Sequence, residues 1–166
     1  MIVLVLGGTR SGKSTVAERI ASRLPQPVTY VATASVGRDD DDFAARVAKH
    51  RERRPTAWRT LEEPDDLAGC IGATDGTVLV DSIGTWIAGG HEFARDVDGL
   101  CHVCVERDGD TVLVGEEVGL SVHPPTEVGR RFADALGECN RRIADVADRV
   151  LLVVAGRALE LGSVDA

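Results

Sequence analysis

Five short apolar runs, each rich in β-branched residues, recur along the chain. They are "IVLVL" from Ile2, "VTYVAT" from Val28, "TVLVD" from Thr77, "TVLVG" from Thr111 and "RVLLVVA" from Arg149. Continuous apolar runs of this length are typical of strands that are covered on both faces of a parallel sheet. We therefore predict that these runs form buried parallel strands.

The segments between these runs show the period of an α-helix. The clearest one begins at about Thr126 and has apolar residues three or four positions apart, at Val128, Phe132, Leu136, Cys139, Ile143 and Val146. Strand and helix alternate throughout, which predicts an α/β fold with a mostly parallel open sheet flanked by helices. The chain has 166 residues and no repeat, linker or low-complexity tract. We expect one domain that spans residues 1–166.

The stretch "GGTRSGKS" follows the first apolar run and precedes the helical "STVAERIASRL". It fits the P-loop pattern G-x-x-x-x-G-K-S in the strand-to-helix context that this motif requires. Its glycines let backbone N–H groups face a phosphate, its lysine can reach the terminal phosphates, and its last hydroxyl can bind Mg²⁺. We predict a P-loop NTPase-type (RecA-like) domain that binds GTP or ATP with Mg²⁺ through Gly7, Gly8, Thr9, Arg10, Ser11, Gly12, Lys13 and Ser14.

Carboxylates follow two of the predicted strands. Asp81 ends "VLVD", and Glu116 and Glu117 end "VLVGEE". The carboxyl ends of parallel strands meet at one edge of a sheet, so these groups are expected near the phosphates. Asp81, with Ser14, could bind Mg²⁺, and Glu116 or Glu117 could bind Mg²⁺ or orient an acceptor hydroxyl. Solvated side chains at the strand end are an equally good interpretation of the glutamates. Our predicted metal ligands are Ser14, Asp81 and Glu117.

One histidine, His50, lies in the basic stretch "VAKHRERRPTAW". Residues 39–54 have helical spacing, with Phe43, Val47 and His50 on one face and Pro55 after the end. His50 is then either a packed core histidine or a neutral imidazole that acts as a nucleophile, because the surrounding cations disfavour its protonation. The sequence of this stretch alone favours the packed histidine.

The overall charge limits the class of partner. The formal net charge is −8, which argues against binding of nucleic acid or an anionic membrane surface. The basic cluster around His50 therefore suits a small anion. Met1 leads directly into the first apolar run, and no apolar run is long enough to span a bilayer. These features predict a cytoplasmic protein.

The stretch "CHVC", from Cys101 to Cys104, has the spacing of a metal or redox motif. A zinc site needs about four ligands, and no second cysteine pair accompanies this one. The simpler interpretation, small apolar side chains on a helix with reduced thiols, is favoured.

Together, these motifs resemble the bifunctional family of adenosylcobinamide kinase and adenosylcobinamide-phosphate guanylyltransferase enzymes of cobalamin biosynthesis. The similar segments are "GGTRSGKS", "YVAT", "AARVAKHRERRPTAWRTLEEP", "VLVDS", "EVG" and "GRRFADALGECNRRIADVADRVLLVVAG". They cover nearly the whole chain, and residues 83–110 are the poorest match.

The resemblance implies two reactions in one protein. The enzyme would phosphorylate adenosylcobinamide and then transfer GMP from GTP, through a covalent GMP–histidine intermediate on His50, to give adenosylcobinamide-GDP. The neighbouring arginines would stabilise the anionic phosphorus centre and the departing pyrophosphate. The further nucleotide-binding residues implied by the resemblance are Thr33, Ala34, Ser35, Arg51, Glu52, Arg53, Arg54, Glu62 and Asp81.

A carboxylate can accept hydrogen bonds from the ring N–H and exocyclic amine of guanine. Glu62 or Asp81 could therefore select the base, and Asp81 is also a candidate Mg²⁺ ligand. The resemblance also implies a corrinoid substrate and a homo-oligomer, with Trp86 and the poorly matching segment at a subunit surface.

The chain also departs from the family pattern. Glu116 stands where the family usually has Asn, and "DSIGTW" and "VHPP" differ from the usual residues where the corrinoid would bind. Two alternatives to the bifunctional enzyme therefore stay open. One is a P-loop kinase of another small hydroxyl substrate, and the other is a degenerate GTP-binding paralogue with a regulatory role.

Overall fold

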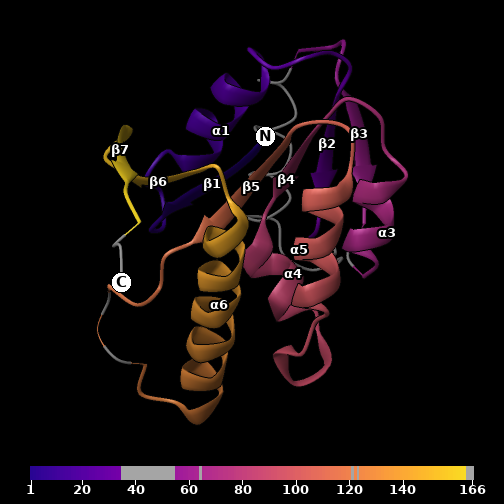
Figure 1. Cartoon of the computed structure of the whole chain (residues 1–166). Helices are drawn as coiled ribbons and strands as arrows, with labels where there is room; N and C mark the ends of the chain where they lie inside the picture. Colours follow the sequence, from indigo (N-terminus) through magenta and orange to yellow (C-terminus); the bar gives the residue numbers. More distant parts are fainter. Residues whose placement is uncertain (35–54, 64, 121, 123, 164–166) are drawn as a thin grey trace.

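The computed structural model describes residues 1–34, 55–63, 65–120, 122 and 124–163. Within these residues, the strands form one sheet in the order β3-β2-β4-β5-β1-β6-β7 (Figure 1). All neighbouring strands are parallel except β6 and β7, which are antiparallel. The strands are β1 (Ile2–Gly7), β2 (Val28–Ala32), β3 (Arg59–Glu62), β4 (Thr77–Asp81), β5 (Thr111–Glu116), β6 (Arg149–Val154) and β7 (Arg157–Leu161).

All five predicted strands are confirmed, and the sheet is mostly parallel as predicted. Two further strands were missed. The four residues of β3 are half-buried or exposed, and all five residues of β7 are exposed, so neither strand has a continuous apolar run. The β6–β7 hairpin turns through Ala155 and Gly156, which both have positive φ (50° and 73°). Positive φ at both turn residues is the geometry that a two-residue hairpin favours.

Helices cover both faces of the sheet. They are α1 (Lys13–Ala21), α3 (Leu67–Gly72), α4 (Ile83–Ala88), α5 (Val97–Glu106) and α6 (Glu127–Val146), with a short 3-10 helix η1 (His91–Phe93) between α4 and α5. Figure 1 shows α3, α4, α5 and α6 on one face and α1 behind the sheet. The expected α/β architecture of a sheet flanked by helices is thus confirmed.

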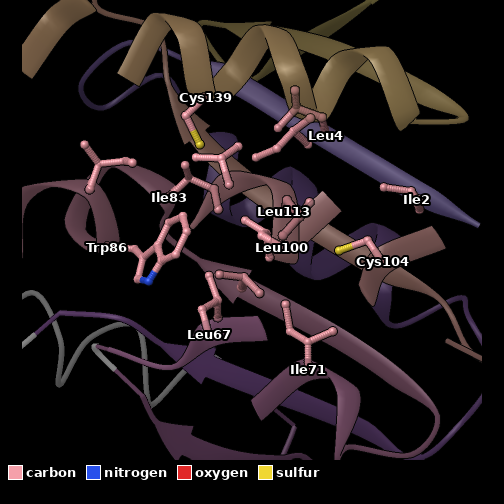
Figure 2. Close-up of a cluster of buried hydrophobic side chains, with 14 of the residues drawn as sticks. Ile2, Leu4, Leu67, Ile71, Ile83, Trp86, Leu100, Cys104, Leu113 and Cys139 are labelled. Carbon is pink, nitrogen blue, oxygen red and sulfur yellow. The ribbon is translucent and has the colours of Figure 1, made fainter. Parts of the chain in front are cut away.

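Alternate residues of each central strand enter two separate cores. On β1, Leu4 enters the larger core with α3 to α6, and Val3 and Val5 enter the smaller core under α1. Figure 2 shows the larger core, in which Leu4, Leu113, Ile83 and Leu100 converge from strands and helices. Each fully buried aliphatic side chain contributes about 1.5–3 kcal/mol of transfer free energy. The buried centre of the sheet is formed by β1, β2, β4 and β5.

The predicted helix from Thr126 is confirmed as α6. Thr126 caps it, because its Oγ1 accepts a hydrogen bond from the Gly129 N–H at 3.1 Å. Leu136 and Ile143 of the predicted stripe are buried, but Val128 is 63% exposed. The first turn of α6 projects beyond the sheet (Figure 1), so its apolar residue has no core to enter.

The prediction that Trp86 lies at a subunit surface is wrong. Trp86 on α4 is 2% exposed and packs into the larger core (Figure 2). Its indole N–H donates to the carbonyl oxygen of Asp65 at 3.2 Å, and the Arg95 guanidinium lies 5.6 Å from its ring centre. This indole therefore holds α4 against the loop before α3.

The cysteines behave as the simpler interpretation predicted. Cys101 and Cys104 lie on α5, Cys139 lies on α6, and the four described thiols are free. Burial raises the pKa of Cys104 and of Cys139 to about 12. These two side chains are therefore protonated, apolar parts of the core at neutral pH.

None of the helices in the described part of the chain is long and apolar enough to cross a membrane. The predicted helix over residues 39–54 lies outside the described residues. His50, Ser35, Arg51, Glu52, Arg53 and Arg54 lie outside them too.

Candidate functional site

The P-loop connects β1 to α1 at the carboxyl edge of the sheet. Gly7 ends β1 and Lys13 begins α1, as the motif predicts. Gly12 has φ 93°, a left-handed conformation that glycine adopts without a Cβ penalty. The Ser11 N–H donates to the Gly8 carbonyl at 3.2 Å, which closes the turn. This loop places the start of α1 directly beyond the strand end.

The start of α1 is open toward an anion. Among the described side chains, none caps the helix at Gly12. The positive end of the helix dipole at this terminus suits a phosphate. Ser14, the second residue of α1, is half-buried in this turn. The geometry is that of a phosphate-binding loop.

The β6–β7 turn supports this loop from outside. The Gly156 N–H donates to the Ser11 carbonyl at 2.7 Å. A Cβ on Gly12 would lie 3.2 Å from the Gly156 Cα, and a Cβ on Gly7 would overlap Ser11 Oγ and the Val153 carbonyl. Close approach of neighbouring atoms therefore favours glycine at positions 7 and 12, and the positive φ is a second reason at Gly12 alone. This contact was not expected from the sequence.

The Lys13 ammonium lies over the loop. Its Nζ is 3.8 Å from Glu116 Oε1 and donates to the Gly8 carbonyl at 3.4 Å. The Lys13 side chain is only 12% exposed. The ammonium is thus held where the terminal phosphates of a bound nucleotide would lie.

Asp81 and Glu116 share the sheet face that carries α1. Leu79, two residues before Asp81, and Val114, two residues before Glu116, both enter the smaller core under α1. Since side chains alternate along a strand, the two carboxylates continue on the same face. The Tyr30 hydroxyl donates to Asp81 Oδ2 at 3.0 Å, and the Gly84 N–H donates to Glu116 Oε2 at 2.9 Å. The strand ends therefore bring two oriented carboxylates to the P-loop side.

Glu117 occupies the opposite face. Its main-chain N–H donates to the Gly7 carbonyl at 3.1 Å, and its carboxylate accepts from the Gly119 N–H at 2.6 Å. The side chain lines a cavity of about 780 Å³ between α6 and β6–β7, together with Leu6 and Asn140. Glu117, the glutamate predicted as a metal ligand, therefore lies away from the P-loop side, because it follows Glu116 directly and takes the other face of β5. Glu116 is the glutamate that the structure places beside Lys13.

Thr33 follows β2 and is 1% exposed. Its hydroxyl donates to the Ser82 carbonyl at 2.6 Å, accepts from the Ser82 N–H at 3.0 Å and lies 2.6 Å from Thr85 Oγ1. These contacts use the whole hydrogen-bonding capacity of the hydroxyl. Thr33 therefore fixes the start of α4, and Ala34, half-buried beside it, continues the chain along the carboxyl edge.

Glu62 lies at the end of β3 and is exposed. It pairs in register with Ala32, which in turn pairs with Asp81. Glu62 and Asp81 are thus two strands apart, about 10 Å at the usual strand spacing. A ligand that contacts both must extend across β2.

The donor set at this edge has the chemistry that Mg²⁺ prefers. It combines the hydroxyl of Ser14 with the carboxylates of Asp81 and Glu116, all hard oxygen ligands, and Mg²⁺ needs only one or two protein carboxylates besides phosphate and water. Within the described residues, no group of three or more His, Cys, Asp or Glu side chains forms a metal cage. A metal that binds here would thus be held partly by the nucleotide.

Known proteins match this chain along its length. The model of a family described as cobinamide kinase / cobinamide phosphate guanyltransferase matches residues 3–161. The bifunctional adenosylcobalamin biosynthesis protein CobP of Pseudomonas aeruginosa is 38% identical over 167 residues, which cover 95% of each chain. The protein CobU of Salmonella typhimurium, described in the same words, is 35% identical over 183 residues, which cover 97% of this chain and 99% of that protein.

The fold also resembles a solved ATPase from the type III secretion system of pathogenic bacteria. The TM-score is 0.55 at 10% sequence identity, over 91% of this chain and 50% of that one. This chain thus spans half the length of the ATPase. At such low identity the similarity shows a shared fold, which agrees with the P-loop architecture predicted from the sequence.

Proposed function

The chain belongs to the cobinamide kinase / cobinamide phosphate guanyltransferase family, and we propose that it phosphorylates adenosylcobinamide and then transfers GMP to the product. The observation that carries this proposal is the P-loop at the carboxyl edge, where Lys13 lies beside Glu116 and on the same face as Asp81. This geometry suits the phosphates of a nucleoside triphosphate. The match over residues 3–161 supports the choice of substrates.

In the first reaction, the aminopropanol hydroxyl of adenosylcobinamide attacks the γ-phosphorus of ATP or GTP. The bond from the γ-phosphorus to the bridging oxygen breaks, a nucleoside diphosphate leaves and the hydroxyl loses its proton. Backbone N–H groups of the P-loop and the Lys13 ammonium would hold the phosphates. Ser14 and Asp81 would hold Mg²⁺, which neutralises charge on the phosphate oxygens.

In the second reaction, a ring nitrogen of His50 attacks the α-phosphorus of GTP, and pyrophosphate leaves. A phosphate oxygen of adenosylcobinamide phosphate then attacks the phosphorus atom of the GMP–His50 intermediate. The new O–P bond forms, the P–N bond breaks, and the products are adenosylcobinamide-GDP and free histidine. The basic residues Arg51, Arg53 and Arg54 would stabilise the developing negative charge. The sequence around His50 supports this step.

The separation of Glu62 and Asp81 favours different tasks for the two carboxylates. Asp81 is on the face of α1 and one strand from Glu116, which suits Mg²⁺ near the phosphates. Glu62 lies two strands farther out at the exposed end of β3, which suits the guanine base. We propose these assignments for the two residues.

Assembly and location complete the proposal. We propose a cytoplasmic homo-oligomer, since the cytoplasm supplies ATP and GTP. The outer strand β7 carries Leu159 and Leu161, which are 62% and 40% exposed. Such an apolar edge supports association with another chain.

Labelled GTP provides the test. We expect acid-labile label to remain on the protein from α-labelled GTP and not from γ-labelled GTP, and we expect adenosylcobinamide to receive the γ-label. Transfer of the γ-label without any protein-bound α-label would instead identify a kinase. Binding of GTP without turnover of either label would identify a regulatory paralogue.

A further inference from the structure

Glu116 is held by two contacts to its carboxylate and one to its main-chain carbonyl. Its Oε2 accepts from the Gly84 N–H at 2.9 Å, at the start of α4. Its Oε1 faces the Lys13 ammonium at 3.8 Å. The main-chain carbonyl of Glu116 accepts from Asn140 Nδ2 at 3.0 Å. One carboxylate oxygen is therefore anchored to the scaffold, and the other faces the phosphate site.

Gly84 is shaped to hold this carboxylate. It is buried, and a Cβ at this position would overlap Glu116 Oε2. The absence of a side chain lets the N–H of α4 reach the carboxylate directly. Strand geometry contributes as well, because Glu116 pairs in register with Gly7, the first residue of the P-loop motif. The close approach of Lys13 and Glu116 thus follows from the backbone on both sides.

The ion pair lies at the P-loop, because Lys13 also donates to the Gly8 carbonyl. The Lys13 and Glu116 side chains are 12% and 29% exposed, so their attraction is screened less than that of a surface pair. A bound triphosphate brings three or four negative charges to this lysine. For Lys13 to contact the phosphates, its ion pair with Glu116 must break. The hydrogen bond from the Gly84 N–H keeps the carboxylate in place.

We propose that Glu116 is a positioning residue that holds Lys13 over the P-loop and releases it to the phosphates when a triphosphate binds. The proposal rests on the proposed function, because it describes a change at the same phosphate site. Once Lys13 has moved to the phosphates, the anchored carboxylate faces them as an unpaired negative charge. Glu116 therefore opposes triphosphate binding unless Mg²⁺ is present to screen the charge.

The ion pair can be tested in the ligand-free protein. The chain contains only two lysines, Lys13 and Lys49, so labelling lysine with ¹³C at Cε gives two resolvable NMR signals, which Lys49→Arg assigns. We expect Glu116→Gln to shift the Lys13 signal and to leave the Lys49 signal in place. Glu117→Gln is the matched control, since it makes the same change one residue away on the opposite face, and it should move neither signal. An unchanged Lys13 signal in Glu116→Gln would overturn the proposal.

Binding of tripolyphosphate without Mg²⁺ tests the exchange. We expect Glu116→Gln to bind it about 5- to 30-fold more tightly than the wild type, the range of a modest coupling between two sites. Glu117→Gln should stay within about twofold of the wild type. Weaker or equal binding by Glu116→Gln would show that the carboxylate supports the loop and would contradict the exchange.

Gly84→Ala gives a second route that keeps the negative charge. Its Cβ displaces the Glu116 carboxylate, so the Lys13 signal should shift in this variant as well.

If the wild type bound neither tripolyphosphate nor GTP, the proposed function would fail. The NMR comparison in the ligand-free protein would still decide whether Glu116 holds Lys13.

Discussion

The Tyr30 hydroxyl donates a hydrogen bond to Asp81 Oδ2 at 3.0 Å, from β2 to the neighbouring strand β4. Tyr30 is 4% exposed and packs in the smaller core under α1. An aromatic side chain in a tight core has few alternative rotamers. The buried ring thus fixes the direction of a carboxylate at the edge of the phosphate site.

Tyr30→Phe keeps the ring and removes this hydrogen bond. We expect a loss of about 1 kcal/mol in the free energy of unfolding, measured by urea denaturation. Because Asp81 loses its orientation, the Mg²⁺ concentration that half-saturates γ-phosphoryl transfer should rise severalfold. An unchanged Mg²⁺ requirement in a folded variant would show that Tyr30 supports only the core.

Lys13→Ala should remove triphosphate binding. The ammonium faces the position of the terminal phosphates, and the rest of the chain is strongly acidic, so we expect at least about a 100-fold loss of affinity, measured by calorimetry with Mg²⁺ present. Arg19→Ala is the matched control, since Arg19 is an exposed cation on the same helix. Tight GTP binding by Lys13→Ala, with or without Mg²⁺, would contradict the P-loop assignment.

His50→Ala should separate the two reactions. It removes the proposed nucleophile and leaves residues 7–14 intact, so protein labelling by α-labelled GTP should disappear while most γ-phosphoryl transfer remains. His50→Asn tests the packed-histidine interpretation, because it keeps a polar side chain that cannot form a stable phosphoramidate. GMP transfer at the wild-type rate by His50→Asn would make His50 structural and favour a kinase.

The buried thiols should make the protein less stable at high pH. Burial raises the pKa of Cys104 and Cys139 from 9.0 to about 12. Between these values the unfolded chain releases protons that the folded chain retains, so the free energy of unfolding falls as the pH rises above 9. Each thiol contributes a slope of up to about 1.4 kcal/mol per pH unit.

Urea denaturation at pH 8 and pH 10 measures this effect. The double variant Cys104→Ala and Cys139→Ala should be less stable at pH 8, because it loses packing, but its stability should fall less between the two pH values. An equal fall in the wild type and the variant would assign the pH dependence to other groups.

Light scattering tests the proposed assembly. We expect a mass that is a multiple of the 17.6 kDa of one chain. Leu159→Arg should lower this mass, because it places a charge on the exposed edge of β7. Glu160→Gln on the same strand serves as the control. A wild-type protein that is monomeric and fully active would contradict the proposal.

The central fold could be predicted because its strands are continuously apolar. That pattern identified β1, β2, β4, β5 and β6, and the helical period identified α6. The outer strands lack such a signal, since β3 has only four residues and β7 faces solvent. For β7, the one sequence feature that could have indicated a hairpin is Gly156, because glycine favours the positive φ of a tight turn.

For the candidate site, the sequence predicted the P-loop but not the roles of the residues around it. The P-loop motif carries its own geometry, so residues 7–14 were found from sequence. The choice between Glu116 and Glu117 depends on which face each side chain takes at the end of β5, and two adjacent glutamates give no such information. The commitment of Thr33 to Ser82 and Thr85 depends on tertiary contacts. Both points therefore needed the structure.

The hydrogen bond from the Gly156 N–H to the Ser11 carbonyl joins the outer hairpin to the phosphate loop. Because it lies at the turn between β6 and β7, any partner that shifts the β7 edge would also shift the P-loop backbone. Thermodynamic linkage makes such an influence reciprocal. If two chains associate through this edge, their affinity for each other will depend on whether nucleotide is bound, and nucleotide titrations will depend on protein concentration.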